Sequence, residues 1–210
     1  MNLQDFRRNY SLGKLSKADL DPNPIKQFER WMQQTVESGF SDPTAMVIAS
    51  VDSNGMPNQR YVLLKQFDED GFVFFTDTES QKGREIAQNP QISLLFPWHQ
   101  FERQVRIRGV AKPLNVADVE AYFHSRPKMS QKAAACSQQS QPIASREALE
   151  KKFRAIDVTG HELPLPARWG GYRVIPQCFE FWQGGDHRLH DRFQYDLDAA
   201  NIWQVQRLQP

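Results

Sequence analysis

The sequence predicts a mainly β protein with helices, of the α+β class, in which an antiparallel β-barrel carries peripheral helices. Three observations predict this fold. At least seven segments with strand-like composition are joined mainly by tight turns. Short helical patterns with recognisable caps lie between and around these segments. Neither G-x-G-x-x-G nor G-x-x-x-x-G-K-[ST] occurs, which disfavours a Rossmann or P-loop nucleotide site.

Length and composition bound the organisation. The 210 residues, 40% hydrophobic and 24% charged, suit one large soluble domain or two small ones. A composition shift near residue 113 could mark a domain boundary. Because the late strands are expected to complete the early sheet, we predict an N-terminal arm or flap over residues 1–22 and a single domain over residues 23–210.

Charge and motif content narrow the function classes. A net charge of +1 gives no global attraction to nucleic acid or to an anionic membrane. Residues 1–20 lack the apolar core of a signal peptide, and no run has the length of a membrane span. Cys136 and Cys178 form no C-x-x-C pair, so neither a redox motif nor a structural zinc site is supported. We expect a cytoplasmic protein that binds neither nucleic acid nor membrane.

The first helix is well marked. Asn23 is a suitable N-cap, Pro24 suits the first helical position, and Gly39 ends the pattern. The apolar stripe comprises Ile25, Phe28, Trp31, Met32 and Val36. The stripe predicts packing against a core.

Strand patterns begin at residue 45. Residues 45–51, 60–65 and 72–76 read as three strands of an antiparallel meander, with turns at 53–55 and 68–71. A hydroxyl-rich junction at residues 76–83 then leads into a short helix. Free N–H groups at that helix start could form an anion pocket, but ordinary N-capping by Ser80 or Thr78 is the better supported interpretation.

The middle of the chain carries a polar strand face and a set of donors. Residues 92–96 and 101–110 read as strands, and the polar face of the second is either solvated or meets a partner or ligand. In the helix that follows Asn115, Tyr122 and Arg126 project from one side, and Ser130 lies past a proline break. All three side chains donate hydrogen bonds, which suits phosphate oxygens.

The C-terminal part reads as one more helix and four strands. A helix starts at Ser145, and strands are expected over residues 171–175, 178–182, 189–196 and 202–208. If the third of these is a regular strand, Arg188, His190 and Arg192 share one face. A solvated edge strand would explain them. Trp182 and the glycine pair at 184–185 instead suggest a site for a planar ligand that bears a phosphate.

Several long motifs in the same order resemble the pyridoxine/pyridoxamine 5′-phosphate oxidase family over nearly the whole chain. They are DPTAM at 42–46, QR at 59–60 with VLLK at 62–65, SLLFPW at 93–98, ERQV at 102–105, YFHSRP at 122–127, and FWQGG at 181–185 with HRLHDR at 187–192. The resemblance implies a split β-barrel that works as a homodimer, with FMN bound between subunits. It implies FMN-dependent oxidation of pyridoxamine or pyridoxine 5′-phosphate to pyridoxal 5′-phosphate, with O2 as acceptor and H2O2 as product.

The resemblance also implies site residues. Cofactor-binding positions would be Arg60, Lys65, Phe75, Thr76, Gln81, Lys82, Gln104, Gln139, Ser140, Trp182 and Arg192. Substrate-binding positions would be Arg7, Tyr10, Lys65, Tyr122, Arg126, Ser130, Arg188 and His190, with Arg188 and His190 also catalytic. Phe75, Gln81 and Asn9 depart from the family pattern, which often has tyrosine, arginine and an acid there.

Two questions remain open from the sequence. Arg60 and Lys65 differ by an odd number and should face opposite sides of a strand, so a bulge or two neighbouring ligands is required. A flavin- or haem-binding split barrel of other specificity is the main alternative, and a nucleic-acid- or protein-binding barrel is disfavoured by the near-zero net charge.

Overall fold

The computed structural model describes residues 1–5, 8–158 and 162–210. The strands are β1 Ala45–Val51, β2 Pro57–Leu63, β3 Gln66–Asp68, β4 Gly71–Asp77, β5 Gln91–Trp98, β6 Arg103–Pro113, β7 Trp169–Gln183, β8 Asp191–Leu197 and β9 Trp203–Leu208. The α-helices are α1 Pro24–Glu37, α2 Gln81–Gln88, α3 Val116–Ser125, α4 Lys128–Cys136 and α5 Arg146–Ala155, and short 3-10 helices are η1 Lys17–Asp19, η2 His99–Phe101 and η3 Asp186–Arg188. The α+β class is confirmed.

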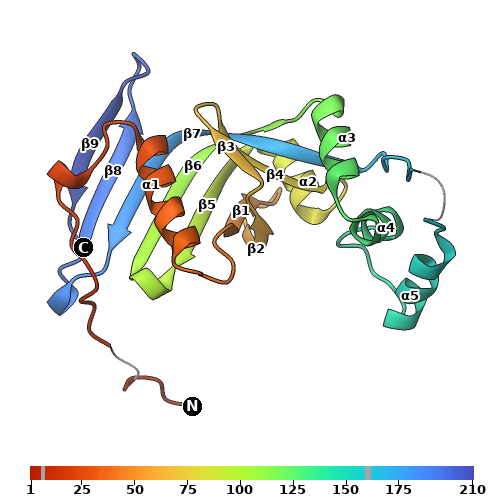
Figure 1. Ribbon diagram of the computed structural model, residues 1–210, viewed down its shortest axis with the longest axis horizontal. Coiled ribbons are helices and arrows are strands. Elements are labelled where there is room, and N and C mark those ends of the chain that lie inside the picture. The colour runs from red at the N-terminus through yellow and green to blue at the C-terminus, as the bar shows by residue number, and fades with distance from the viewer. Residues whose placement is uncertain (6–7, 159–161) are drawn as a thin grey trace.

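One antiparallel sheet forms a curled, split half-barrel. Its order is β2-β1-β5-β6-β7-β4-β3, with β8 on β7 and β9 on β8. The strand β7 pairs with β6 along one side, while on its other side its first half pairs with β4 and its second half with β8. Figure 1 shows the result, with β8 and β9 at one end of the molecule and α3, α4 and α5 at the other.

Three strand predictions need correction. The predicted meander is wrong beyond its first hairpin, because β4 pairs with β3 and β7 and not with β2. The strands expected at 171–175 and 178–182 form the single strand β7, which continues past Pro176 because the register with β6 shifts between Arg108 and Gly109. A Cβ on Gly109 would lie 2.2 Å from the Ile175 carbonyl oxygen, so this close approach requires glycine.

The third correction concerns residues 188–192. The chain does not enter a strand after the glycine pair, since residues 186–188 form η3 and β8 starts only at Asp191. His187 and Arg188 adopt left-handed φ values of 54° and 65°. The predicted common face of Arg188, His190 and Arg192 is therefore wrong, because side-chain alternation applies only within a strand.

The helices begin where local capping predicts. Asn23, Ser80, Asn115 and Ser145 each accept a hydrogen bond from a backbone N–H in the first turn of the following helix. The helix α4 has no such side-chain cap and was not predicted. From the stripe of α1, Val36 is 54% exposed, whereas the other four residues are buried.

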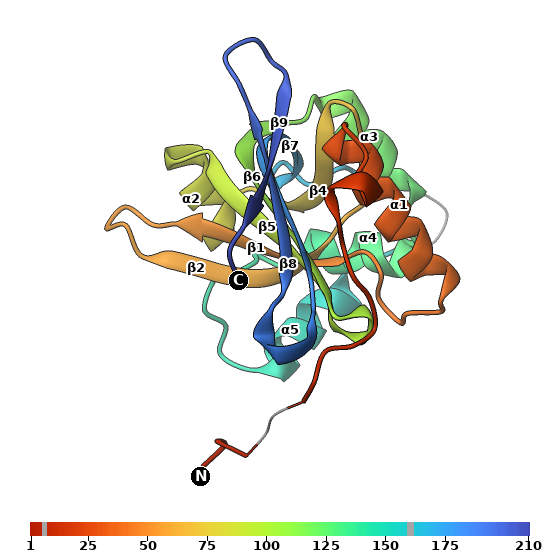
Figure 2. The same ribbon diagram turned by 90° about the vertical axis from the view of Figure 1, so that its left-hand side faces the viewer.

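The core lies between α1 and the sheet. Phe28 of α1 makes edge contacts with Phe67, Phe72 and Phe96 at centroid distances of 4.8–5.0 Å. Trp31 makes a similar contact with Phe181 at 5.3 Å. Figure 2 shows the N-terminal arm descending beside β8. The arm is fastened there by two bonds, from Leu12 N–H to Glu102 Oε2 and from Leu15 N–H to Asp191 Oδ2.

Candidate active site

A cavity of about 770 Å3 opens between β2, β4, α2 and the α3–α4 region. It brings together eleven predicted residues, namely Arg60, Lys65, Phe75, Thr76, Gln81, Lys82, Tyr122, Arg126, Ser130, Gln139 and Ser140. The other lining residues are Asn58, Gln59, Tyr61, Val62, Leu63, Pro127 and Trp169. Most of the predicted site is therefore assembled by a single chain.

The cavity lining is strongly cationic. Arg60, Lys65, Lys82 and Arg126 lie on it, and no Asp or Glu is found among the described lining residues. Cations that share such a space repel one another, and an anion placed between them reduces that repulsion. The lining therefore favours ligands with anionic groups such as phosphates.

Lys82 is the most buried cation of the cavity, at 6% exposure. Its Nζ donates to Gln139 Oε1 at 2.5 Å, to Thr76 Oγ1 at 3.1 Å and to Ser80 Oγ at 3.3 Å. Burial, followed by the nearby Arg60, lowers the pKa of Lys82 to about 8, while Asp77 and Glu85 act in the opposite direction. An anion bound beside Lys82 would stabilise its charged form.

Arg60 is held in place by a buried carboxylate that the sequence analysis missed. Arg60 Nη2 donates to Glu85 Oε2 at 3.3 Å, and Arg60 Nη1 donates to Ser50 Oγ at 2.5 Å. Gln81 Nε2 donates to Glu85 Oε1 at 2.9 Å. Burial alone would raise the pKa of Glu85, but hydrogen bonds from Ser50 and Gln81, together with Arg60, lower it. The spacing of Gln81 and Glu85 on α2 is the signal that could have revealed this contact.

The question raised by Arg60 and Lys65 is answered without a bulge. The strand β2 ends at Leu63. Leu64 N–H then bonds to Thr44 O, and Lys65 N–H bonds to Val73 O, so the chain crosses from β1 towards β4 at this point. Because Lys65 lies outside β2, strand alternation does not constrain it, and both cations line the same cavity.

Aromatic rings form part of the cavity lining. The rings of Phe75 and Tyr122 stack at 3.7 Å and 13°. The Arg126 guanidinium lies over the Trp169 ring at 4.4 Å. Burial raises the pKa of Tyr122, so its hydroxyl is a donor at neutral pH. Arg126 Nη1 and Trp169 Nε1 are buried and have no hydrogen-bond partner within the described residues, which is costly unless a ligand accepts from them.

The remaining predicted residues gather at the opposite end of β7. Trp182 packs against His190 at 4.8 Å, and Tyr10 of the arm makes edge contacts with Trp182 at 5.8 Å and with His190 at 5.4 Å. Trp182 lies opposite Gln104 of β6 on one side and opposite Arg192 of β8 on the other. We call Tyr10, Gln104, Trp182, Arg188, His190 and Arg192 the Trp182 group. The predicted flap residue Arg7 lies outside the described residues.

The polar side chains of the Trp182 group differ from one another in their hydrogen bonding. Gly185 N–H donates to His190 Nδ1 at 3.2 Å, so the neutral ring carries its proton on Nε2. Burial, followed by Arg188, lowers the pKa of His190. Arg192 donates to Glu180 Oε1 at 2.8 Å and to Gln209 O at 2.9 Å. Arg188 is exposed and makes no hydrogen bond or ion pair with the described residues.

The cavity and the Trp182 group do not meet within one chain. Trp169 lines the cavity at the start of β7, and Trp182 lies near the end of the same strand. Thirteen residues of strand span about 40 Å at 3.3 Å per residue. In Figure 1 the elements bearing the two groups accordingly occupy opposite ends of the molecule.

Three further observations bear on the kind of protein. In the described part of the chain, no three His, Cys, Asp or Glu side chains gather into a group that could hold a metal ion. Cys136 and Cys178 are free thiols. No described helix is both long and apolar enough to cross a membrane. Fold and cavity together define a split-barrel protein with a pocket lined by cations.

Comparison with known proteins identifies the family. Residues 32–160 match the family described as pyridoxamine 5′-phosphate oxidase, and residues 169–210 match the pyridoxine 5′-phosphate oxidase C-terminal dimerisation region. The pyridoxine/pyridoxamine 5′-phosphate oxidases of Idiomarina loihiensis and Shewanella denitrificans are 53% and 55% identical, over 100% of this chain and 100% and 99% of theirs. The chain belongs to the pyridoxamine 5′-phosphate oxidase family.

Solved structures agree with this assignment. PhzG from Burkholderia lata, in complex with tetrahydrophenazine-1-carboxylic acid, superposes with a TM-score of 0.88 at 31% identity and covers 93% of this chain and 98% of its own. A pyridoxamine 5′-phosphate oxidase-related, FMN-binding protein from Nostoc punctiforme has a TM-score of 0.73 at 17% identity, over 91% of this chain and all of its own. The second likeness bears on the fold alone.

Proposed function

We propose that this protein is an FMN-dependent oxidase that converts pyridoxamine 5′-phosphate and pyridoxine 5′-phosphate to pyridoxal 5′-phosphate, with O2 as acceptor and H2O2 as product. The observation that carries the proposal is the cavity, which holds four cations and no carboxylate among its described lining residues. The chain belongs to the pyridoxamine 5′-phosphate oxidase family, and relatives that match it over their full length are named for the same reaction. Both findings support the proposal.

The cavity residues fit a flavin mononucleotide. Arg60, Lys82 and Ser140 would hold its phosphate and ribityl chain, and Phe75, Thr76, Gln81 and Gln139 would line the rest. Lys82 suits this role because its ammonium is buried among neutral acceptors and its charge is poorly compensated. When bound, the flavin would take a hydride from the substrate and pass the electrons to O2.

The substrate phosphate would lie on a second set of donors in the same cavity. Lys65, Tyr122, Arg126 and Ser130 all line the cavity and can all donate to phosphate oxygens. The unpartnered Arg126 Nη1 is the strongest single indication, because a buried guanidinium nitrogen requires an acceptor. A second anion site next to a cofactor phosphate is what a phosphorylated substrate needs.

A homodimer would complete the site. The Trp182 group lies about 40 Å along β7 from the cavity, so a second copy is needed to bring Arg188 and His190 to the same ligand. The match of residues 169–210 to a dimerisation region supports this arrangement. Gln104, Trp182 and Arg192 would then contact the cofactor held by the other chain, and Tyr10, with Arg7, would close over the substrate.

The two residues proposed as catalytic would act by charge and orientation. The Arg188 guanidinium is free to contact the substrate and would stabilise the charge that develops at the reacting carbon. His190 has a lowered pKa and a ring fixed by Gly185 and Trp182, so it would present a neutral Nε2–H to the substrate ring. Neither role requires a conventional general base.

The test is peroxide release from purified protein given pyridoxamine 5′-phosphate, with and without added FMN. We expect release that depends on FMN and on substrate, together with formation of pyridoxal 5′-phosphate. A protein that binds FMN and oxidises neither vitamin B6 phosphate would instead be a split-barrel flavoprotein of other specificity. A preparation with no flavin affinity would refute the proposal as a whole.

A further inference from the structure

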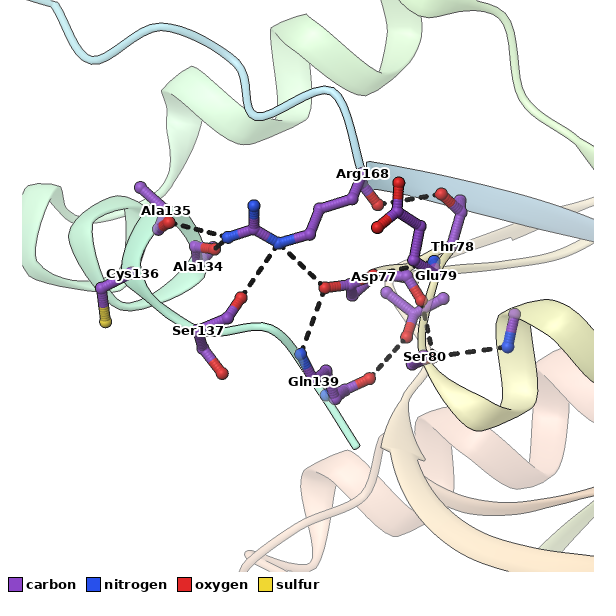
Figure 3. A network of polar contacts seen from close by, with 12 residues as sticks. Asp77, Thr78, Glu79, Ser80, Ala134, Ala135, Cys136, Ser137, Gln139 and Arg168 are labelled. Atoms are coloured by element: carbon purple, nitrogen blue, oxygen red, sulfur yellow. Dashed lines mark hydrogen bonds and ion pairs between the residues drawn. The ribbon is translucent and has the colours of Figure 1, made fainter. Parts of the chain in front are cut away.

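Arg168, the residue before β7, donates hydrogen bonds to the C-terminal end of α4. Its Nη2 donates to Ala135 O at 2.7 Å and to Ala134 O at 3.1 Å, and its Nε donates to Ser137 O at 3.0 Å (Figure 3). These carbonyls lie at the C-terminal end of α4, where helix carbonyls lack partners within the helix. A cation is favourable at this end of a helix.

Arg168 is joined to a buried acid at the end of β4. Its Nε lies 3.1 Å from Asp77 Oδ2, and Asp77 is only 5% exposed. Gln139 N–H donates to the same Oδ2 at 3.3 Å, and Glu79 N–H donates to Asp77 Oδ1 at 2.8 Å. Figure 3 shows Arg168 and Asp77 linking the end of β4, the chain after α4 and the start of β7.

The chain after α4 has little other support. Residues 138–147 are exposed. Gln139 lines the large cavity on one side and a second hollow of about 360 Å3 on the other, which is also lined by Asp77, Glu79, Gln138, Gln141, Pro142 and Arg168. With open space on both sides, polar contacts hold this segment in position and apolar packing contributes little.

The segment places one acceptor on the buried cation of the cavity. Gln139 Oε1 accepts from Lys82 Nζ at 2.5 Å and from Thr76 Oγ1 at 3.1 Å. A continuous set of contacts therefore runs from Arg168 through Asp77 and the Gln139 backbone to the Lys82 ammonium. Arg168 itself lies behind the segment and does not line the large cavity.

We propose that Arg168 is a positioning residue for the cofactor pocket. By holding residues 137–139 through their carbonyls and through Asp77, it keeps Gln139 on Lys82 and so sets the affinity for the phosphate-bearing cofactor. This inference rests on the proposed function, because it takes the ligand beside Lys82 to be FMN. It adds a residue outside the cavity to those that govern cofactor binding.

The experiment is an FMN titration of the cofactor-free protein, followed by the quenching of flavin fluorescence. We expect Arg168→Met to raise the Kd for FMN by about tenfold, the effect of losing one charge-assisted hydrogen bond. The matched control is Arg173→Met. Arg173 lies on β7 five residues after Arg168, pairs with Asp68 and is 23% exposed against 20% for Arg168, and it does not line the cavity. Its Kd should stay within about twofold of the wild type.

A double-mutant cycle with Gln139→Ala separates positioning from general damage. If Arg168 acts through Gln139, the double variant should bind FMN about as weakly as either single variant. If Arg168→Met merely loosens the fold, or leaves Asp77 as a repelling charge, the two factors should multiply to about a hundredfold. Multiplication of the factors would overturn the inference.

Two further measurements keep the inference testable. The KM for substrate at saturating FMN should stay within about twofold in Arg168→Met, since its proposed effect is on cofactor binding. If that variant does not fold, Asp77→Asn, which preserves side-chain shape, takes its place in the cycle. Wild-type protein that fails to bind FMN would refute the proposed function, whereas equal binding by the wild type and Arg168→Met would refute only the positioning role.

Discussion

The cavity and the Trp182 group lie at opposite ends of β7 and hold their cations in opposite ways. In the cavity, Lys82 and Arg60 are buried or half-buried and each is oriented by several hydrogen bonds from the same chain. In the Trp182 group, Arg188 is exposed on a left-handed turn with no bonded partner in the described residues. Under the proposed function, the first region would be preorganised to bind an anion, while the second would present Arg188 outward to a ligand.

This difference is what the proposed homodimer requires, with one chain binding the cofactor and the other supplying Arg188. The free-energy cost of desolvating a buried cation is met when the chain folds. If the cation is also oriented by hydrogen bonds, it can bind a phosphate without further rearrangement. An outward-facing guanidinium gains nothing in its own chain, so its use depends on what docks against it. Five predictions test this contrast, from the largest expected effect to the smallest.

Arg188→Leu should slow flavin reduction by substrate by about a hundredfold to a thousandfold, as for loss of a donor that stabilises developing charge. The Kd for FMN should stay within about twofold, because Arg188 lies outside the cavity. Anaerobic stopped-flow absorbance measures the first quantity and fluorescence titration the second. Arg154→Leu on the exposed side of α5 is the control. Weakened FMN binding with unchanged reduction would contradict the assignment.

Lys82→Met should raise the Kd for FMN by about tenfold to a hundredfold, the range for loss of a charge-assisted bond to phosphate. Turnover at saturating FMN should change far less, because Lys82 contacts no reacting group in the proposed site. Lys128→Met removes an exposed lysine at the start of α4 and serves as control. An unchanged Kd in Lys82→Met would mean that the phosphate lies elsewhere in the cavity.

The wild-type affinity for FMN should depend on pH through Lys82. Its pKa is lowered to about 8, chiefly by burial. Only the charged form binds phosphate well, and phosphate is already dianionic above about pH 7. The Kd should therefore be flat from pH 7 to 8 and should rise by about tenfold per pH unit above that, until the higher pKa of the complex is reached. A flat Kd from pH 8 to 9.5 would show that Lys82 stays charged in the free protein.

Mixing the two variants at an FMN concentration that loads the wild type but not Lys82→Met, so that each variant alone is inactive, tests the shared site directly. Lys82→Met has an intact Arg188, and Arg188→Leu has an intact cavity, so a mixed dimer contains one complete site and one doubly defective site. Random exchange of subunits should restore about a quarter of wild-type activity, since half of the dimers are mixed and half of their sites are complete. No recovery, under conditions where mass spectrometry shows exchange, would place the two regions in the same working chain.

How far the sequence predicted this arrangement depends on whether the controlling contact is local. The caps Asn23, Ser80 and Asn115 bond within three residues, so the helix starts were predicted correctly. Tyr122, Arg126 and Ser130 were predicted to converge and do line one cavity, although Arg126 is the extended C-cap of α3 and Ser130 lies on α4, so helical spacing does not explain it.

Contacts between segments that are far apart in the sequence could not be predicted. Arg168 meets Asp77 across 91 positions of sequence, and no local pattern signals that pair. The common face predicted for Arg188 and His190 failed because the chain turns through η3 before β8, which strand periodicity cannot reveal. The residues proposed for FMN and substrate binding come from the family resemblance and stay predictions.

The smallest predicted effect concerns Trp169, which lies under Arg126 in the cavity wall. Trp169→Leu removes the aromatic face beneath the guanidinium and should raise the KM for pyridoxamine 5′-phosphate by about two- to fivefold, with kcat unchanged. Trp169→Phe keeps an aromatic face and should remain closer to the wild type. If both variants are equally weak, the unpartnered indole N–H, and not the ring face, is what the substrate uses. In either case the effect should fall on substrate and leave the Kd for FMN unchanged, because Trp169 supports Arg126, which is proposed to bind the substrate phosphate.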